Sequence, residues 1–236
     1  MSTRIPTQVA QVRGGAQLSD VLRSLALPGL GERSCGTVIT DHGSSWVRLV
    51  GNSTNTYFTK TYDYPSARRR WSGLLRNTGP WTRSRAAREY DAMRWMLASG
   101  LPSATPIGVL EWRTFGLLRR AVLVTAQFEG AALSSLLPEV GPAERLALAL
   151  ATGHLIGHLH RRGFRDRNLD LRNLLAQRRA DGSWHIVKID SPRHVLRRPG
   201  IDEDALTRAD WARLLPQFTP FDLADAVRRA AADVMA

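Results

Sequence analysis

The chain has 236 residues and a formal net charge of +12, which comes from 33 lysines and arginines against 21 aspartates and glutamates. This length predicts one domain or two small lobes, and the hydrophobic fraction of 43% is too high for a disordered chain. The single cysteine, Cys35, excludes an internal disulfide framework and a cysteine-based zinc site. Only Lys60 and Lys188 are lysines, so each of them needs a specific explanation.

The charge and hydropathy patterns bear on location and partners. The N-terminal sequence has no apolar signal core, and no apolar run reaches the roughly 18 residues of a membrane-spanning helix. We therefore expect a cytoplasmic protein. The positive charge favours an anionic partner, which is a nucleotide, a nucleic acid or an anionic membrane surface. A genome that encodes arginine in place of lysine throughout explains the charge equally well.

The first half of the chain is predicted to be rich in strands. The apolar spacing from Leu18 to Leu25 indicates a short helix before Pro28–Gly29. Three segments rich in β-branched and aromatic residues follow, and the turn residues between them predict an antiparallel meander. These segments are Thr37–Thr40, Trp46–Val50 and Thr56–Tyr62.

Residues 65–85 are basic and are predicted to be irregular. A helix is predicted over residues 84–99, and Gly100 marks its end. Two more strands, Ile107–Trp112 and Ala121–Phe128, bring the first half to five strands with one helix after the third. The apolar stripe of the helix consists of Ala86, Tyr90, Met93 and Leu97.

The second half is predicted to be mainly helical, with short strands in the segment that ends near Pro192. The composition changes near Glu129–Gly130, which predicts two lobes with a ligand cleft between them. The predicted helices are Pro142–Arg162, Asp202–Leu215 and Phe221–Val234.

Lys60 lies in the third predicted strand, where alternation turns it away from the side of Thr59 and Thr61. A compact ammonium suits a phosphate oxygen where a guanidinium does not fit. Glu89 lies one position off the apolar stripe of the helix and could orient Lys60 through an ion pair. A solvent-facing lysine and a local pair between Glu89 and Arg85 are the alternatives.

The segment Gly163–Leu175 has the most specific pattern, because polar loop residues precede an apolar pair. Downstream, His185–Ser191 reads as an alternating strand that ends in Asp190. Phosphate binding through Mg²⁺ needs oxygen ligands that converge on the metal ion from separate loops. The arrangement resembles the catalytic and metal-binding loops of the protein-kinase-like fold.

More specifically, five segments in the same order resemble the lipopolysaccharide core kinase family, which phosphorylates Kdo or heptose sugars and has the protein-kinase-like fold. The resemblance covers residues 35 to 216. The segments are the lysine strand Tyr57–Tyr62, the glutamate helix Ser84–Tyr90, the turn Gly100–Pro106, the lobe-connecting hinge Val124–Gly130 and the helix motif Asp210–Leu215.

The resemblance implies an α+β, protein-kinase-like two-lobe fold, with a small antiparallel-sheet N-lobe that has one helix and a mostly helical, shortened C-lobe. Residues 1–34 would form an N-terminal extension with a short helix. The nucleotide-binding N-lobe would span residues 35–129, and the C-lobe with the catalytic-like and metal-binding loops would span residues 130–236.

The resemblance also implies ATP and Mg²⁺ as cofactors and a sugar or glycolipid as the acceptor. Lys60 would contact the ATP phosphates, and Glu89 would hold Lys60 in place. Asn173 and Asp190 would be the Mg²⁺ ligands. The adenine would face the backbone of Gln127, Phe128 and Glu129.

One position departs from the family pattern, in which an Asp precedes the metal-binding Asn by five residues. That position is Asn168 here, and an amide can accept a hydrogen bond from a hydroxyl but cannot take its proton. Loss of a general base costs about 10²- to 10⁴-fold, although positioning and metal charge carry most of phosphoryl transfer. We therefore expect nucleotide binding with greatly weakened transfer, unless Asp166 or Asp170 substitutes as a catalytic carboxylate.

Three classes of function follow: a sugar kinase, a pseudokinase that binds nucleotide without transfer, and a basic nucleic-acid-binding protein. The scarcity of lysine and the lack of a recognisable binding motif argue against nucleic acid.

Three other features carry weaker signals. Arg68 to Arg85 would either contact an anionic membrane at its inner face or form a solvated loop. His154 and His158 have a metal-compatible spacing, but the glycines beside them favour close helix packing. Lys188 is predicted to lie on a strand surface.

Overall fold

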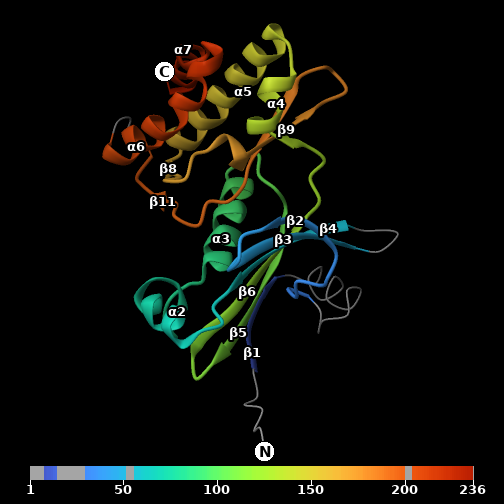
Figure 1. Cartoon of the computed structure of the whole chain (residues 1–236). Coiled ribbons are helices and arrows are strands. Elements are labelled where there is room, and N and C mark those ends of the chain that lie inside the picture. The colour runs from blue at the N-terminus through green and yellow to red at the C-terminus, as the bar shows by residue number, and fades with distance from the viewer. Residues whose placement is uncertain (1–7, 15–29, 52–55, 200–203, 236) are drawn as a thin grey trace, which may run out of the picture. The chain divides into compact units, whose positions relative to one another are not determined.

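The computed structural model describes residues 8–14, 30–51, 56–199 and 204–235 (Figure 1). The helix predicted between Leu18 and Leu25 lies outside these residues. The chain divides into two compact units. The first, the sheet unit, consists of Met1–Asp91 and Thr105–Gln127. The second, the helical unit, consists of Ala92–Ala104 and Phe128–Ala236.

The sheet unit contains an antiparallel sheet of six strands in the order β1-β5-β6-β4-β3-β2. The five predicted strands are all present, and β1 is an additional one that the prediction missed. A register shift between Val9 and Gln11 breaks the alternation by which a strand is recognised in sequence. The strands are β1 (Gln8–Gly14), β2 (Thr37–Asp41), β3 (Ser45–Gly51), β4 (Thr56–Asp63), β5 (Pro106–Thr114) and β6 (Leu117–Ala126).

One face of this sheet carries the core of the unit. Residues 45–51 alternate between partly exposed and buried side chains, as expected for a strand with one covered face. The core residues are Leu30, Val50, Ile107, Leu110, Val122 and Val124.

Strands β5 and β6 form a hairpin. The predicted strand Ala121–Phe128 begins earlier than expected, at Leu117, and ends at Ala126 rather than Phe128. Phe115 and Gly116, which connect the two strands, both have the positive φ angles of a two-residue hairpin turn.

The basic stretch at residues 65–85 is not irregular, which corrects the prediction. It contains the helix α2 (Ala67–Ser72) and the π-helical turn η2 (Leu74–Thr78). Ser66 begins α2 by accepting a hydrogen bond from the Arg69 amide. Because α2 buries none of its residues, it has no apolar stripe that sequence periodicity could detect.

Helix α3 (Arg85–Ala98) confirms the predicted helix, and Ser84 caps its first turn by accepting from the Ala87 amide at 3.0 Å. The predicted stripe is correct at three positions and wrong at Leu97, which is 41% exposed. Met96 is buried in its place. Gly100 ends the helical segment with φ of +70°.

Within the described residues, the helical unit contains the end of α3, four complete helices and two small antiparallel sheets, with strand orders β10-β9-β7 and β11-β8. Of the helices, α4 (Leu133–Glu139) was not predicted, because it is short and contains Pro138. The others are α5 (Pro142–Arg161), α6 (Ala205–Leu214) and α7 (Ala224–Met235). The strands are β7 (Ala131–Ala132), β8 (Phe164–Arg165), β9 (Leu174–Arg178), β10 (Trp184–Lys188) and β11 (Val195–Leu196), with 3-10 turns η3 (Leu171–Asn173), η4 (Leu215–Gln217) and η5 (Thr219–Phe221).

Two glycines let α5 and α7 approach closely, as the sequence predicted (Figure 1). A Cβ atom on Gly153 would lie 2.3 Å from the carbonyl oxygen of Val227. A Cβ atom on Gly157 would lie 2.6 Å from the carbonyl oxygen of Ala231. Because both neighbours are backbone atoms, they cannot rotate away from an added methyl group.

We expect Gly153→Ala to lower the free energy of unfolding by about 1 to 3 kcal/mol, because the added methyl group overpacks the α5–α7 contact. Urea unfolding followed by circular dichroism measures this. Gly141→Ser is the control, because Gly141 precedes α5 in open space and serine is a good N-cap residue. A Gly153→Ala chain as stable as the wild type would show that the close approach is not required.

Candidate functional site

In the sheet unit, β4 and α3 bring Lys60 and Glu89 together. The Lys60 Nζ atom lies 3.2 Å from Glu89 Oε1 and 3.1 Å from Glu89 Oε2. Glu89 is 1% exposed, whereas 23% of the Lys60 side chain remains accessible. Thr59 and Thr61 are buried on the opposite side of the strand, as the alternation predicted. Glu89 is therefore a buried carboxylate that holds the ammonium of a partly accessible lysine side chain, not an exposed helix residue.

A second donor was not anticipated from the sequence. The hydroxyl group of Tyr62, two residues after Lys60 on the same face of β4, donates a hydrogen bond to Glu89 Oε1. The Lys60 ammonium also lies 5.3 Å from the centre of the Tyr62 ring. A buried carboxylate must be hydrogen-bonded to offset its desolvation, and Tyr62 contributes to this. The sequence signal for Tyr62 is its position two residues after Lys60, because that spacing places both side chains on the same face of the strand.

In the helical unit, Asp210 of α6 holds the loop that follows β8. Its carboxylate accepts hydrogen bonds from the backbone amides of Asp166 at 2.9 Å and Arg167 at 2.7 Å. The ring of His160 lies 3.3 Å from the same carboxylate. Burial lowers the pKa of His160, so its ring is neutral near pH 7 and donates one hydrogen bond to Asp210. Asp210 thus fixes a backbone turn in which Arg167 has a φ of +58°.

The same loop brings Asn168, Asn173 and Asp190 together. The Asn168 amide donates to the backbone oxygen of Asp190 at 3.0 Å and to its Oδ2 atom at 3.3 Å. The Asn173 amide donates to the backbone oxygen of Asn168 at 3.2 Å. The Ile189 amide in turn donates to the backbone oxygen of Asn173 at 3.0 Å. We call Asn168, Asn173 and Asp190 the loop cluster.

Lys188 is not on a strand surface, which corrects the prediction. It is fully buried, and its Nζ atom lies 3.1 Å from Asp166 Oδ2. The Nζ atom also donates to the backbone oxygen of Ile189. The last three residues of β10, Ile186–Lys188, are all buried, so both faces of the strand are covered there. The alternation of residue types in a short strand does not reveal this. The scarcity of lysine was the signal that could have identified this position.

The two carboxylates predicted as substitutes for the missing base are both engaged elsewhere. Both oxygens of Asp166 are inaccessible to solvent, and burial raises the pKa of this carboxyl against the lowering effect of Lys188. Asp170 accepts three hydrogen bonds from Arg172, between 2.8 and 3.0 Å. These bonds lower the pKa of Asp170, so it is ionised but held by a guanidinium.

The predicted hinge lies where the two units meet in sequence. Gln127 is the last residue of the sheet unit, and its amide donates to Thr56 at 3.3 Å. Phe128 begins the second segment of the helical unit, and its ring centre lies 6.1 Å from that of His185. Glu129 is exposed. A Cβ atom on Gly130 would lie 2.7 Å from the carbonyl oxygen of Ala176, so only glycine fits there.

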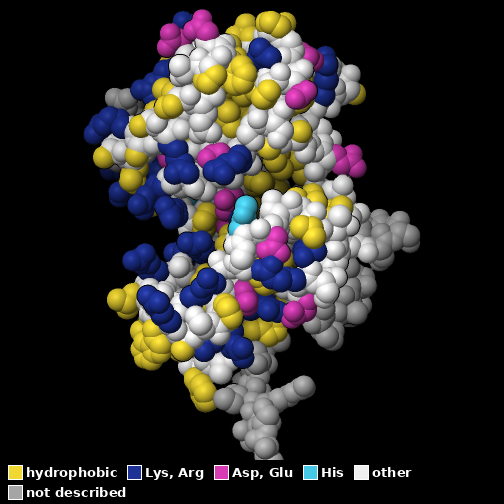
Figure 2. Space-filling view, viewed as in Figure 1, with side chains coloured by type: hydrophobic (Ala, Val, Ile, Leu, Met, Phe, Trp, Pro, Cys, Tyr) yellow, Lys and Arg dark blue, Asp and Glu magenta, His cyan; other side chains and the backbone are white. Residues whose placement is uncertain are grey.

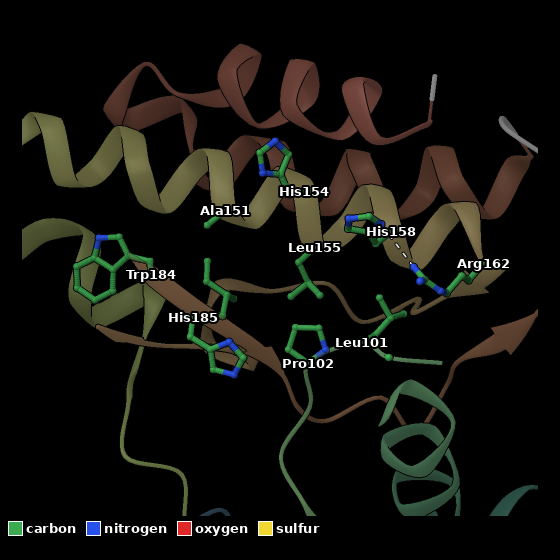
Figure 3. A pocket seen from close by; sticks show the side chains of 11 residues that line it. Leu101, Pro102, Ala151, His154, Leu155, His158, Arg162, Trp184 and His185 are labelled. Atoms are coloured by element: carbon green, nitrogen blue, oxygen red, sulfur yellow. Dashed lines mark hydrogen bonds between the residues drawn. The ribbon is translucent and has the colours of Figure 1, made fainter. Parts of the chain in front are cut away.

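A cavity of about 320 Å³ lies elsewhere in the helical unit, between Gly100–Pro102, α5 and β10 (Figure 3). His154, His158 and His185 line it, but none of the predicted site residues does. Arg162 lies 3.4 Å from the His158 ring. Among the residues that the structure describes, no group of three His, Cys, Asp or Glu side chains is placed to hold a metal ion. The cavity shares no lining residue with the loop cluster.

The comparisons with known proteins agree with this geometry. The profile of the lipopolysaccharide kinase (Kdo/WaaP) family matches residues 45–226, which is more than three quarters of the chain. The protein therefore belongs to this family of phosphotransferases. None of the curated proteins matches the sequence.

A solved structure described as WaaP in complex with acyl carrier protein is similar at a TM-score of 0.66. The two sequences are 15% identical over 95% of this chain and 88% of the other. The α+β, protein-kinase-like fold implied by the sequence is thus confirmed. Since 1115 solved chains match, the fold alone does not define the substrate.

The loop cluster fits a magnesium ion in its donor chemistry. Mg²⁺ takes oxygen ligands and is typically bound by one or two carboxylates together with substrate phosphates. Asp190 would supply one carboxylate, and Asn173 would supply an amide oxygen from a neighbouring turn. With nucleotide phosphates as the remaining ligands, a second carboxylate would not be needed.

We expect Lys188→Met to lower the free energy of unfolding by about 3 to 5 kcal/mol, because it leaves the Asp166 carboxylate buried without its cation. The double variant Asp166→Asn/Lys188→Met removes both charges and should recover part of this loss. Urea unfolding of the three chains measures the coupling. Equal stability of Lys188→Met and the wild type would contradict a structural role for the pair.

Proposed function

We propose that the protein is an ATP-dependent phosphotransferase that phosphorylates a sugar hydroxyl group of a lipopolysaccharide-type glycolipid. The observation that carries this proposal is the loop cluster, in which Asn173 and Asp190 converge in a member of the Kdo/WaaP family. The Lys60–Glu89 ion pair supports it independently, because it presents an ammonium that suits a phosphate oxygen.

The proposed roles divide between the two units. In the sheet unit, Lys60 binds the nucleotide phosphates and Glu89 orients it. In the helical unit, Asn173 and Asp190 hold Mg²⁺, whose charge stabilises the phosphates during transfer. We assign the nucleotide-binding N-lobe to residues 35–129 and the C-lobe to residues 130–236, after an N-terminal extension at residues 1–34. The backbone of Gln127, Phe128 and Glu129 contacts the adenine.

Asn168 would take the place of the general base in this scheme. With its amide nitrogen bound to Asp190, its amide oxygen can accept a hydrogen bond from the acceptor hydroxyl and orient it. Asp166 and Asp170 are poor substitutes, since one is inaccessible and the other is held by Arg172. Transfer would therefore depend on positioning and metal charge, and it would be slow.

A pseudokinase is the second candidate, and one observation favours it. The Asn168 amide donates to both the backbone and the side chain of Asp190, so it joins the two loops without help from a metal ion. An aspartate at position 168 could not make either bond. Asn168 would then serve the structure of a nucleotide-binding module that does not transfer phosphate.

The proposed acceptor also implies a location. None of the helices in the described residues is long and apolar enough to cross a bilayer. We infer that the protein works on the cytoplasmic side, where ATP is present, and contacts the anionic inner face of the membrane through the basic stretch from Arg68 to Arg85.

We expect Asn168→Asp to raise phosphate transfer from Mg-ATP to Kdo- or heptose-lipid acceptors by about 10²- to 10⁴-fold, because it restores a general base. Without Mg²⁺, the new carboxylate would face Asp190 and lower the melting temperature. Mg-ATP should restore that temperature. Transfer of labelled phosphate and thermal shift measure the two effects.

Asp190→Ala in both backgrounds is the control, because it removes the carboxylate ligand. Wild-type turnover that Asp190→Ala abolishes would exclude the pseudokinase. An Asn168→Asp chain that is inert on every sugar acceptor would contradict the sugar kinase.

A further inference from the structure

Four large apolar side chains are exposed at one end of the sheet unit. Trp71, Leu75 and Trp81 are 65%, 91% and 95% exposed, and Phe115 is 86% exposed. Isolated exposed apolar residues are common, but these four are large and lie in α2, in η2, just after η2 and in the β5–β6 turn, so we treat them together as a patch. Figure 2 shows hydrophobic side chains beside basic ones at the α2 end of this unit. We call these four residues together with Arg68, Arg69 and Arg76 the basic aromatic tip.

The tip is held in place by Arg113 of β5. Its guanidinium donates to the carbonyl oxygens of Gly79 at 2.8 Å, Gly116 at 3.1 Å and Thr82 at 3.3 Å. Glu111 completes the anchor with an ion pair to Arg113 at 2.8 Å. These bonds tie the turn that carries Trp81 to the turn that carries Phe115.

The segment before Trp81 is also fixed internally. The Gly73 carbonyl accepts from the amides of Asn77 and Thr78 at 2.8 and 3.0 Å, and Arg88 donates to the Asn77 side chain. The apolar side chains are therefore displayed by an ordered backbone rather than by a loose loop.

The charged residues close in sequence to Trp71, Leu75 and Trp81 are all basic. Residues 64–88 contain seven arginines and no aspartate or glutamate. Arg83 is paired with Asp91 at 2.8 Å. Arg68, Arg69 and Arg76 make no ion pair with any acidic side chain among residues 30–51, 56–199 and 204–235. Guanidinium groups without an acidic partner, close in sequence to exposed tryptophans, complement an anionic lipid surface, where tryptophan prefers the interface.

We propose that the basic aromatic tip inserts into an anionic lipid bilayer, with Trp71, Leu75, Trp81 and Phe115 entering the headgroup region and the arginines binding lipid phosphates. This deepens the proposed function, since a glycolipid acceptor must be reached at a membrane. Leu75 favours a membrane over single-stranded nucleic acid, because bases stack on aromatic rings and a leucine offers none.

Vesicle sedimentation tests the proposal without nucleotide or glycolipid, so that a failed kinase assay does not affect it. The full chain should bind vesicles of equal parts phosphatidylcholine and phosphatidylglycerol, and bind phosphatidylcholine alone much more weakly. Leu75→Ser/Trp81→Ser should reduce binding about tenfold or more, because both apolar contacts are lost. Arg68→Gln/Arg69→Gln should reduce it and flatten its dependence on salt.

The matched control is Leu146→Ser/Leu196→Ser, which removes two exposed apolar side chains of the helical unit, 44% and 48% exposed, and should bind as the wild type does. Brominated lipid reports insertion by quenching tryptophan fluorescence. Trp71→Phe/Trp81→Phe should keep most of the binding and lose most of the quenching.

Equal vesicle binding by the wild type and Leu75→Ser/Trp81→Ser would overturn the proposal. So would a wild-type chain that binds a single-stranded oligonucleotide but not the anionic vesicles.

Discussion

A buried ion pair between Asp166 and Lys188 underlies the site in the helical unit. Asp166 begins the loop that carries Asn168, and Lys188 ends the strand that leads to Asp190. Removing two charges from water costs several kcal/mol for each ion unless they are paired. The loop and the strand therefore cannot separate without leaving a buried charge uncompensated. Asp210 fixes the same loop from α6, and together these contacts keep Asn168 within hydrogen-bond distance of Asp190.

Each of the two lysines in this arginine-rich chain pairs with a buried carboxylate. Lys60 is paired with the buried carboxylate of Glu89 in the sheet unit, and Lys188 with that of Asp166 in the helical unit. The difference lies in exposure, because part of the Lys60 side chain is accessible and none of Lys188 is. The Lys60 side chain thus keeps some access to solvent, whereas Lys188 has none and serves the structure.

The elements that leave a periodic or ordered signal were predictable from the sequence. The strands around Lys60, the helix of Glu89 and the order of the family segments all follow from such patterns. Helix α2 was not predictable, because a helix that buries nothing has no apolar stripe, and β1 was not, because a register shift interrupts its alternation. The burial of Lys188 was not predictable either, since the burial of a strand end depends on tertiary contacts that spacing does not record. The basic stretch was visible as charge, but the ordered display of Trp81 and Phe115 depends on bonds from Arg113.

The central proposal is that Lys60 and Glu89 of the sheet unit and Asn173 and Asp190 of the helical unit bind Mg-ATP, and calorimetric titration tests this directly. We predict that the wild type binds Mg-ATP, and that Lys60→Met and Asp190→Ala each weaken binding about tenfold or more, since each loses a charge-assisted contact. Arg198→Met, at an exposed position, should bind as the wild type does. Absence of binding by the folded wild type, or equal affinity in Asp190→Ala, would contradict the proposed nucleotide site.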